Sequence, residues 1–236
     1  LLAGRVDAAV HSLKDLPTEN PPGLTVGAIP VRADPRDVWI CPRGHTLETL
    51  PEGAVVGTSS PRRRAQLLTR RPDLDVQPIR GNVNTRLRKV QEGQYAAIIL
   101  AAAGVTRLGL EKHITTFLPF EVMLPAAGQG ALAVQCRAGD EATLRLLRLL
   151  DHLPTRLAVT AERAFLAGLG GGCSLPVGAY ATVAGEQIIL RGVVASLEGG
   201  KIISVQGIGV DPEGVGASLA RRALSEGAAE FFSGAV

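Results

Sequence analysis

The chain of 236 residues has few cysteines and no long apolar stretch. Its three cysteines, Cys41, Cys136 and Cys173, are an odd number and form no CxxC pair, which argues against a disulfide framework and a zinc site. No uncharged apolar run reaches about 18 residues, and the first residues lack a charged cap followed by a long apolar segment. We therefore expect no metal site, no membrane span and no signal peptide, and a cytoplasmic protein.

Aromatic residues and lysines are also scarce. Aromatic residues make up 3% of the chain, and lysine occurs only at Lys14, Lys89, Lys112 and Lys201, so arginine carries most of the positive charge. The planar arginine side chain binds carboxylates and phosphates through two parallel hydrogen bonds, which favours an anionic ligand. A source organism with a high growth temperature or a GC-rich genome would also enrich arginine. The positions of the arginines, and not their number, must therefore show whether they bind an anion. No aromatic residue interleaves with them to stack on bases, and we expect no nucleic-acid partner.

Apolar runs alternate with amphipathic segments along most of the chain. The apolar runs predict strands at residues 8–10, 24–29, 38–40, 54–57, 96–101 and 132–135, and the amphipathic segments predict helices at residues 62–70, 85–92 and 141–150. This alternation indicates βαβ units with mainly parallel sheets, whose ligand sites lie on the loops after the strands. From residue 155 onward, a helix, three strands and a last helix predict a small α+β domain.

The segment HSLKD follows the first predicted strand and places an acid and a base on a strand-terminal loop. Alone, this pattern is more typical of a solvated turn with an incidental pair between Lys14 and Asp15. His11 is likewise more typical of a hydrogen-bonded core or loop histidine than of a proton shuttle. By itself, the segment therefore assigns no catalytic role to His11, Lys14 or Asp15.

The segment GTSSPRRR predicts an anion site at a helix N-terminus. A strand ends at its glycine, hydroxyl side chains occupy the N-cap positions, and Pro61 fits the first helical turn. Free backbone N–H groups and the positive end of the helix dipole would face the ligand, together with the hydroxyls of Thr58 and Ser60. Arg62 and Arg63 can converge on the same anion. The pattern GxxxxGK[ST] is missing, so this is not a P-loop.

A second group of arginines lies in the segment RGNVNTR. Arg80 ends a predicted strand, Asn84 or Thr85 can cap the next helix, and Arg86 falls in its first turn. A cation at a helix N-terminus opposes the dipole at a cost of about 0.3 to 1 kcal/mol, which a bound anion would offset. Arg107, after the next buried strand, can contribute from the same sheet edge. The alternative is a set of solvated helix faces or a nucleic-acid surface.

Cys173 follows a run in which four of the five preceding residues are glycine. A lone cysteine is usually a small buried apolar residue. The glycine run instead favours a sulfur on a permissive, exposed loop that can serve as a nucleophile or an attachment point.

Nine motifs, read in order, resemble the porphobilinogen deaminase family. They are HSLKDLP, ADPRDV, GTSSPRRRAQL, RRPDL, IRGNVNTRL, LAAAGVTRLGL, LPAAGQGALAVQCR, TAERAFL and GGGCSLPVGAYA. The resemblance runs from about Val6 to the C-terminus. It implies an α/β fold with two lobes similar to those of periplasmic binding proteins and a small C-terminal α+β domain. The implied domains are residues 1–30 with 126–150, residues 31–125, and residues 151–236.

The resemblance also implies the activity and the site. It implies a monomeric transferase of tetrapyrrole (porphyrin and haem) biosynthesis that condenses four porphobilinogen molecules, each losing ammonia, and releases hydroxymethylbilane. The primer is a dipyrromethane cofactor, joined by a thioether to Cys173, and Asp15 is the implied catalytic carboxylate. The implied binding residues for cofactor and substrate are Ser12, Lys14, Thr58, Ser60, Arg62, Arg63, Arg80, Arg86 and Arg107.

The resemblance is incomplete at the start of the chain. Family members have roughly 70 residues before the HSLKD motif, so we expect the first sheet to have an exposed edge and this chain alone to be poorly active. A two-lobed solute-binding module is the main alternative, and it would carry no covalently added mass. An RNA-binding protein is a further alternative, and salt-sensitive RNA retention would be its mark.

Overall fold

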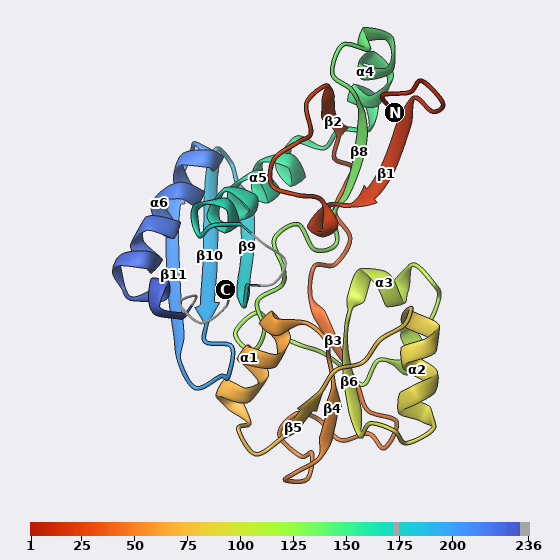
Figure 1. Ribbon diagram of the computed structural model, residues 1–236, viewed down its shortest axis with the longest axis vertical. Coiled ribbons are helices and arrows are strands. Elements are labelled where there is room, and N and C mark those ends of the chain that lie inside the picture. Colours follow the sequence, from red (N-terminus) through yellow and green to blue (C-terminus); the bar gives the residue numbers. More distant parts are fainter. Residues whose placement is uncertain (172–174, 232–236) are drawn as a thin grey trace.

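Three separate β-sheets, each with its own helices, organise the computed structural model, which describes residues 1–171 and 175–231 (Figure 1). The prediction of a mixed α/β protein is confirmed. Within the described residues, every helix is too short or too polar to cross a membrane.

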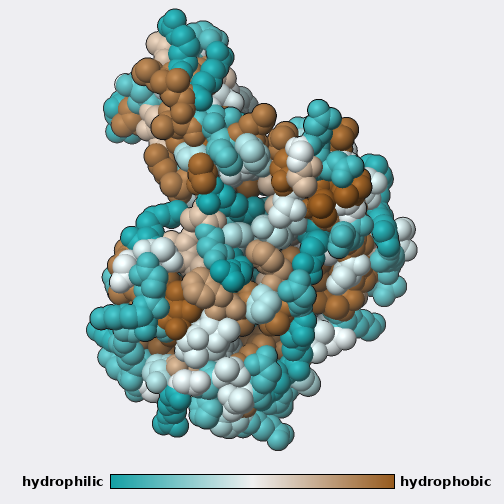
Figure 2. Space-filling view, turned by 180° about the vertical axis from the view of Figure 1, so that it is seen from behind, coloured by the Kyte–Doolittle hydropathy of each residue, from teal (hydrophilic) through white to brown (hydrophobic). Residues whose placement is uncertain are grey.

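The N-terminal sheet has the strand order β1-β8-β2. Its strands are β1 (Ala8–Ser12), β8 (Leu132–Arg137) and β2 (Leu24–Ala28), and α4 (Glu141–Leu147) follows β8. Both pairings are antiparallel, so the expectation of a parallel sheet is wrong here, because β8 comes from the middle of the chain and runs between the first two strands. Figure 2 shows hydrophobic residues among hydrophilic ones at the surface of this upper lobe. Val10, Leu146 and Leu149 are exposed on these elements and the 3-10 helix that follows α4.

The central sheet is mixed. Its strands, in spatial order, are β5 (Asp75–Gln77), β4 (Val55–Gly57), β6 (Ala97–Ala101), β3 (Asp37–Ile40) and β7 (Thr116–Phe117). The strand β4 is parallel to both of its neighbours, as expected, whereas β3 is antiparallel to β6 and β7. One face packs on α1 (Pro61–Arg70) and the other on α2 (Val83–Gln91) and α3 (Ala102–Thr106).

The C-terminal sheet is an antiparallel meander of the three strands that the sequence predicts. It consists of β9 (Val177–Ala184), β10 (Gln187–Ala195) and β11 (Ile202–Gly209), covered by α5 (Leu153–Gly168) and α6 (Pro212–Ser225). Short 3-10 helices occur at Leu13–Asp15, Glu111–His113, Arg148–Leu150 and Ala228–Phe231. Phe165 of α5 fills the space over Gly192, where a Cβ atom would lie 2.5 Å from its ring. This close approach sets the distance between α5 and the sheet.

A buried ion pair joins the segments that connect the three sheets. Glu162 of α5 is fully buried and binds Arg32 through two hydrogen bonds of 2.6 and 3.0 Å. The same carboxylate accepts the backbone N–H groups of Gly128 at 2.7 Å and Ala181 at 2.8 Å. Arg32 lies between β2 and β3, and Gly128 lies between β7 and β8. This one carboxylate therefore ties both crossing segments to the C-terminal unit.

Candidate functional site

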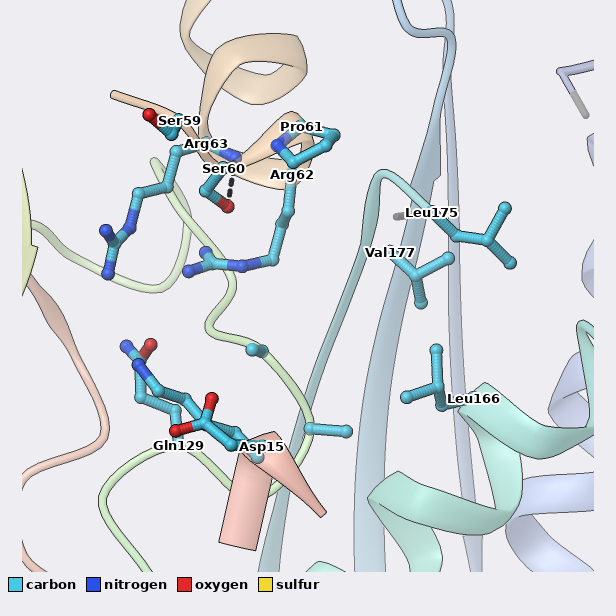
Figure 3. Close-up of a pocket in the computed structure, with 13 residues that line it drawn as sticks. Asp15, Ser59, Ser60, Pro61, Arg62, Arg63, Gln129, Leu166, Leu175 and Val177 are labelled. Carbon is cyan, nitrogen blue, oxygen red and sulfur yellow. Dashed lines mark hydrogen bonds between the residues drawn. The ribbon is translucent and has the colours of Figure 1, made fainter. Parts of the chain in front are cut away.

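A cavity of about 210 Å³ lies where the three units meet. It is bounded by the 3-10 helix after β1, the N-terminus of α1, the segment 126–129, and α5 with the start of β9. Figure 3 shows the arginines of α1 on one side, and Asp15 and Gln129 facing them from the other. Its polar lining residues are Lys14, Asp15, Ser59, Ser60, Arg62, Arg63 and Gln129, and its large apolar ones are Leu166, Leu175 and Val177.

The N-terminus of α1 is built as the sequence predicts, with Ser60 as N-cap and Pro61 in the first turn. The Ser60 hydroxyl accepts the backbone N–H of Arg63 at 3.4 Å. The Thr58 hydroxyl is buried and accepts the backbone N–H of Ser60 at 3.2 Å, and Thr58 does not line the cavity. Ser59 was not predicted, yet it lines the cavity, and its hydroxyl exchanges hydrogen bonds with the backbone of Ile79 at 2.8 and 3.0 Å. These hydroxyls thus fix the loop itself.

The two arginines of α1 are buried and held by Asp37, a residue that the sequence reasoning did not single out. The Arg62 Nη1 donates to Asp37 Oδ2 at 2.7 Å, and the Arg63 Nη2 donates to Asp37 Oδ1 at 2.7 Å. Each guanidinium also donates a hydrogen bond to a backbone carbonyl: Arg62 to that of Leu124, and Arg63 to that of Ile99. Both guanidinium groups are thereby fixed before any ligand arrives.

The electrostatics of this cluster keep the Asp37 carboxyl ionised. Burial alone would raise the pKa of Asp37, but the charges and hydrogen bonds of Arg62 and Arg63 outweigh burial and hold the pKa far below its usual range. Burial lowers the pKa of Arg62, and the Asp37 charge opposes that shift. Two cations share one anion, so the cluster keeps one net positive charge beside the cavity.

Lys14 and Asp15 lie on the 3-10 helix that directly follows β1. Asp15 is exposed and Lys14 is half-buried. Burial lowers the pKa of the Lys14 ammonium, and Arg63 and Arg62 lower it further, although Asp15 opposes them. A bound anion would relieve this crowding of cations. Ser12, at the end of β1, is half-buried and outside the cavity lining.

The remaining predicted arginines do not line the cavity. Arg80 and Arg107 are exposed, and Arg86 is half-buried and donates to the Gly81 carbonyl at 2.7 Å. Burial lowers the pKa of Arg86, and the positive charge of Arg63 lowers it as well. The charge at the start of α1 is therefore felt at Arg86, outside the cavity lining.

The expectation that Asn84 or Thr85 caps α2 is wrong. Asn82 is the cap, and its side-chain oxygen accepts the backbone N–H of Thr85 at 2.9 Å. Asn82 has the extended backbone of an N-cap residue, whereas Asn84 and Thr85 lie within the helix. The helix therefore begins closer to the β5 strand than the apolar pattern indicates.

Two buried polar atoms at the cavity have no hydrogen-bond partner within the described protein. They are the Nε of Arg62 and the Oε1 of Gln129. One is a donor and one an acceptor, so together they fit a ligand that carries both an acceptor and a donor group. Gln129 lies in the motif LPAAGQGALAVQCR, and its position between two glycines is the signal in the sequence that could have pointed to it.

Cys173 lies outside the described residues, and Leu175, which follows it closely in sequence, lines the cavity. Cys41 and Cys136 are buried free thiols. Among residues 1–171 and 175–231, no group of three or more His, Cys, Asp or Glu side chains is arranged to hold a metal ion.

Two family models match the chain. The model described as porphobilinogen deaminase, dipyromethane cofactor binding domain, matches residues 1–145, and the model of the porphobilinogen deaminase C-terminal domain matches residues 156–225. A porphobilinogen deaminase of Brevibacillus brevis is 54% identical over 96% of this chain and 74% of its own length. A porphobilinogen deaminase of Roseiflexus castenholzii is 52% identical over 98% of this chain and 77% of its own length.

Solved structures of binding proteins also align with parts of the chain. A putative methionine-binding lipoprotein from Bacillus subtilis is 10% identical over 54% of this chain and 61% of its own, with a TM-score of 0.37. The substrate binding protein of an amino acid ABC transporter is 15% identical over 63% of this chain and 64% of its own, with a TM-score of 0.35.

Proposed function

This chain belongs to the porphobilinogen deaminase family, and we propose that the cavity between Asp15 and the α1 arginines is its active site. The enzyme condenses porphobilinogen units stepwise into hydroxymethylbilane for tetrapyrrole biosynthesis, with a dipyrromethane cofactor. When bound, the cofactor supplies the pyrrole ring to which the first porphobilinogen is joined. We assign the enzyme to the transferases, because the reaction moves a pyrrolylmethyl group from porphobilinogen to that ring.

One observation carries the assignment of the site: three cations and one carboxylate converge on the same cavity. Lys14, Arg62 and Arg63 line it with Asp15 (Figure 3). Each pyrrole ring of substrate and cofactor carries an acetate and a propionate, and charge-assisted hydrogen bonds to such groups contribute roughly 1.5 to 3 kcal/mol each. The cations therefore bind the ring substituents, which leaves the Asp15 carboxylate for the reacting part of the ligand.

Asp15 is the group we assign to catalysis. Its carboxylate can accept hydrogen bonds from pyrrole N–H groups and stabilise the positive charge that develops as the amino group leaves as ammonia. Asp15 is exposed, and within residues 1–171 and 175–231 no hydrogen bond or ion pair engages its carboxylate, so it is available to a ligand.

The Asp15→Asn variant tests this role. Asparagine keeps the shape of the side chain and loses the charge, so we expect a folded protein whose rate of hydroxymethylbilane formation falls by more than about 100-fold. The measurement is product formation from porphobilinogen, with thermal unfolding as the control for folding. A rate within tenfold of the wild type would contradict the assignment.

The other site residues remain part of the proposal with different support. Cys173 is proposed as the attachment point, since the cavity extends to Leu175 close to it in sequence. Three predicted arginines, Arg80, Arg86 and Arg107, lie outside the cavity lining, so we assign them, with Ser12, to binding the ligand rings that are added later. Thr58 and Ser60 shape the loop before α1.

The proposed division into domains is residues 1–30 with 126–150, residues 31–125 and residues 151–236, and it is supported by the presence of one sheet in each part. A cytoplasmic monomer remains a proposal as well.

A further inference from the structure

The side-chain amide of Gln129 is fixed in one orientation. Gln129 is 1% exposed, and its Nε2 donates to the Pro35 carbonyl at 2.7 Å and to Asp37 Oδ1 at 2.9 Å. Both amide hydrogens are therefore used. Turning the amide over would place its oxygen against two acceptors, so the hydrogen-bond network itself excludes the flipped form. The Oε1 atom has no hydrogen-bond partner among residues 1–171 and 175–231, and it belongs to a residue that lines the cavity.

Asp37 links this acceptor to the unpaired donor nearby. Its Oδ1 accepts from Gln129 and Arg63, and its Oδ2 accepts from Arg62. The Nε of Arg62 is then the buried nitrogen of that guanidinium with no partner in the described protein. A buried polar group without a partner is costly, so such atoms at a cavity point to a group that completes them. One buried carboxylate thus positions both an acceptor and a donor.

We propose that Gln129 contacts the substrate or cofactor directly, with its Oε1 accepting a hydrogen bond from a pyrrole N–H, while Arg62 Nε donates to a carboxylate of the same ligand. Asp37 is the positioning residue for both atoms. This inference rests on the proposed function, because a pyrrole that bears carboxylates is what matches the two atoms. An amide oxygen takes up no proton near neutral pH, so Gln129 contributes to binding and Asp15 alone to charge stabilisation.

The first test replaces Gln129 by methionine, which has a similar volume and no comparable hydrogen-bonding groups. We expect the KM for porphobilinogen to rise about 3- to 10-fold, with a smaller change in kcat, as for the loss of one hydrogen bond to the ligand. The fraction of protein that carries the cofactor, read from the intact mass, should fall as well. Gln66→Met is the matched control, because Gln66 is also buried beside Arg62 and its amide binds the backbone of Leu124.

The second test, Gln129→Glu, remains decisive if the methionine variant fails to fold. In its protonated form, the introduced carboxyl group donates its one hydrogen to Asp37, gives up the bond to the Pro35 carbonyl and still presents a carbonyl oxygen to the cavity. Its ionised form is repelled by Asp37. Substrate binding by this variant, followed as the thermal shift that porphobilinogen produces, should match the wild type at low pH. It should weaken as the pH rises, and the wild type and Gln66→Met should lack this new dependence.

The outcomes separate this inference from the proposed function. One outcome is that the wild type makes hydroxymethylbilane and that Gln129→Met changes KM and cofactor loading no more than Gln66→Met does. In that case the role of Gln129 is structural, water satisfies the hydrogen bonding of Gln129 Oε1 and Arg62 Nε, and the inference is overturned. Equal binding by Gln129→Glu at all pH values would overturn it too. A wild type that neither carries the cofactor nor consumes porphobilinogen would refute the proposed function, and the inference with it.

Discussion

Asp37 shows what individual residues reveal only in three dimensions. The sequence places Arg62 and Arg63 at a helix N-terminus and predicts an anion there. It does not show that the first anion is the protein's own carboxylate, because Asp37 precedes these arginines by 25 and 26 residues. The motif ADPRDV also contains Asp34 and Arg36, and spacing alone does not distinguish the more exposed Asp34–Arg36 pair from the buried pairs of Asp37.

The Asp37→Asn variant tests the importance of this cluster. Breaking a buried pair by removing one partner costs about 3 to 5 kcal/mol, because two buried arginines lose their counter-charge. Asp34→Asn is the control, because its partner Arg36 is 39% exposed and such a pair contributes about 0 to 1 kcal/mol. Urea unfolding at neutral pH measures both. A loss below about 1 kcal/mol for Asp37→Asn would show that the cluster is dispensable.

The same variant has a defined pH dependence. The folded pKa of Asp37 lies below its unfolded value of about 3.9, so its contribution to the free energy of unfolding is complete above that pH. The contribution is lost only as the pH falls through the folded pKa. The deficit of Asp37→Asn relative to the wild type should therefore be constant from about pH 5 to 8 and shrink only in strong acid.

Among helices and strands, local signals predict positions well and pairings poorly. Ser60 and Pro61 fix the start of α1, as the sequence predicts, because capping depends on neighbouring residues. The antiparallel pairing of β8 is not predicted, since its partners β1 and β2 lie more than 100 residues away in the chain. The cap of α2 is predicted too late, because the apolar pattern marks the buried face of a helix and not its first residue.

The packing of α5 on α6 gives a prediction at Gly216. A Cβ atom there would lie 2.5 Å from the Ala161 carbonyl oxygen and 2.7 Å from the Phe165 nitrogen. Because these two contacts are with backbone atoms, we expect the upper part of the range for overpacking, about 2 to 3 kcal/mol. The helix preference of alanine returns about 1 kcal/mol, so Gly216→Ala should lose about 1 to 2 kcal/mol. In Gly139→Ala the new atom meets nothing within 4 Å, and stability should change by less than about 0.5 kcal/mol. Equal stabilities of the two variants would contradict this helix packing.

The arrangement of the whole molecule depends on contacts between distant residues. The order of nine motifs identifies the family from the sequence, and it says nothing about how the three units meet. The Arg32–Glu162 pair joins residues that are 130 positions apart, and no periodicity or motif spacing links them. The cavity exists only because such contacts bring α1, the segment 126–129 and α5 together.

Glu162→Gln should loosen this junction. The amide keeps the size of the side chain but leaves Arg32 without its buried counter-charge, at a cost of about 3 to 5 kcal/mol. We expect faster limited proteolysis in the crossing segments near Gly128 as well as lower stability. Glu226→Gln is the control, because Arg222 and Glu226 are 59% and 40% exposed and their loss should cost at most about 0.5 kcal/mol. Unchanged proteolysis in Glu162→Gln would mean that other contacts hold the units together.

The intact mass of the purified protein tests the proposed chemistry most directly. If dipyrromethane is attached through Cys173, the mass will exceed that of the sequence by two porphobilinogen molecules less two molecules of ammonia. One ammonia is lost when the thioether forms and one when the second ring is joined, and the whole excess will be absent from Cys173→Ser. An unmodified mass in protein that still forms hydroxymethylbilane, or an excess that persists in Cys173→Ser, would contradict the attachment. An unmodified mass together with binding but no conversion of porphobilinogen would instead support a two-lobed binding module.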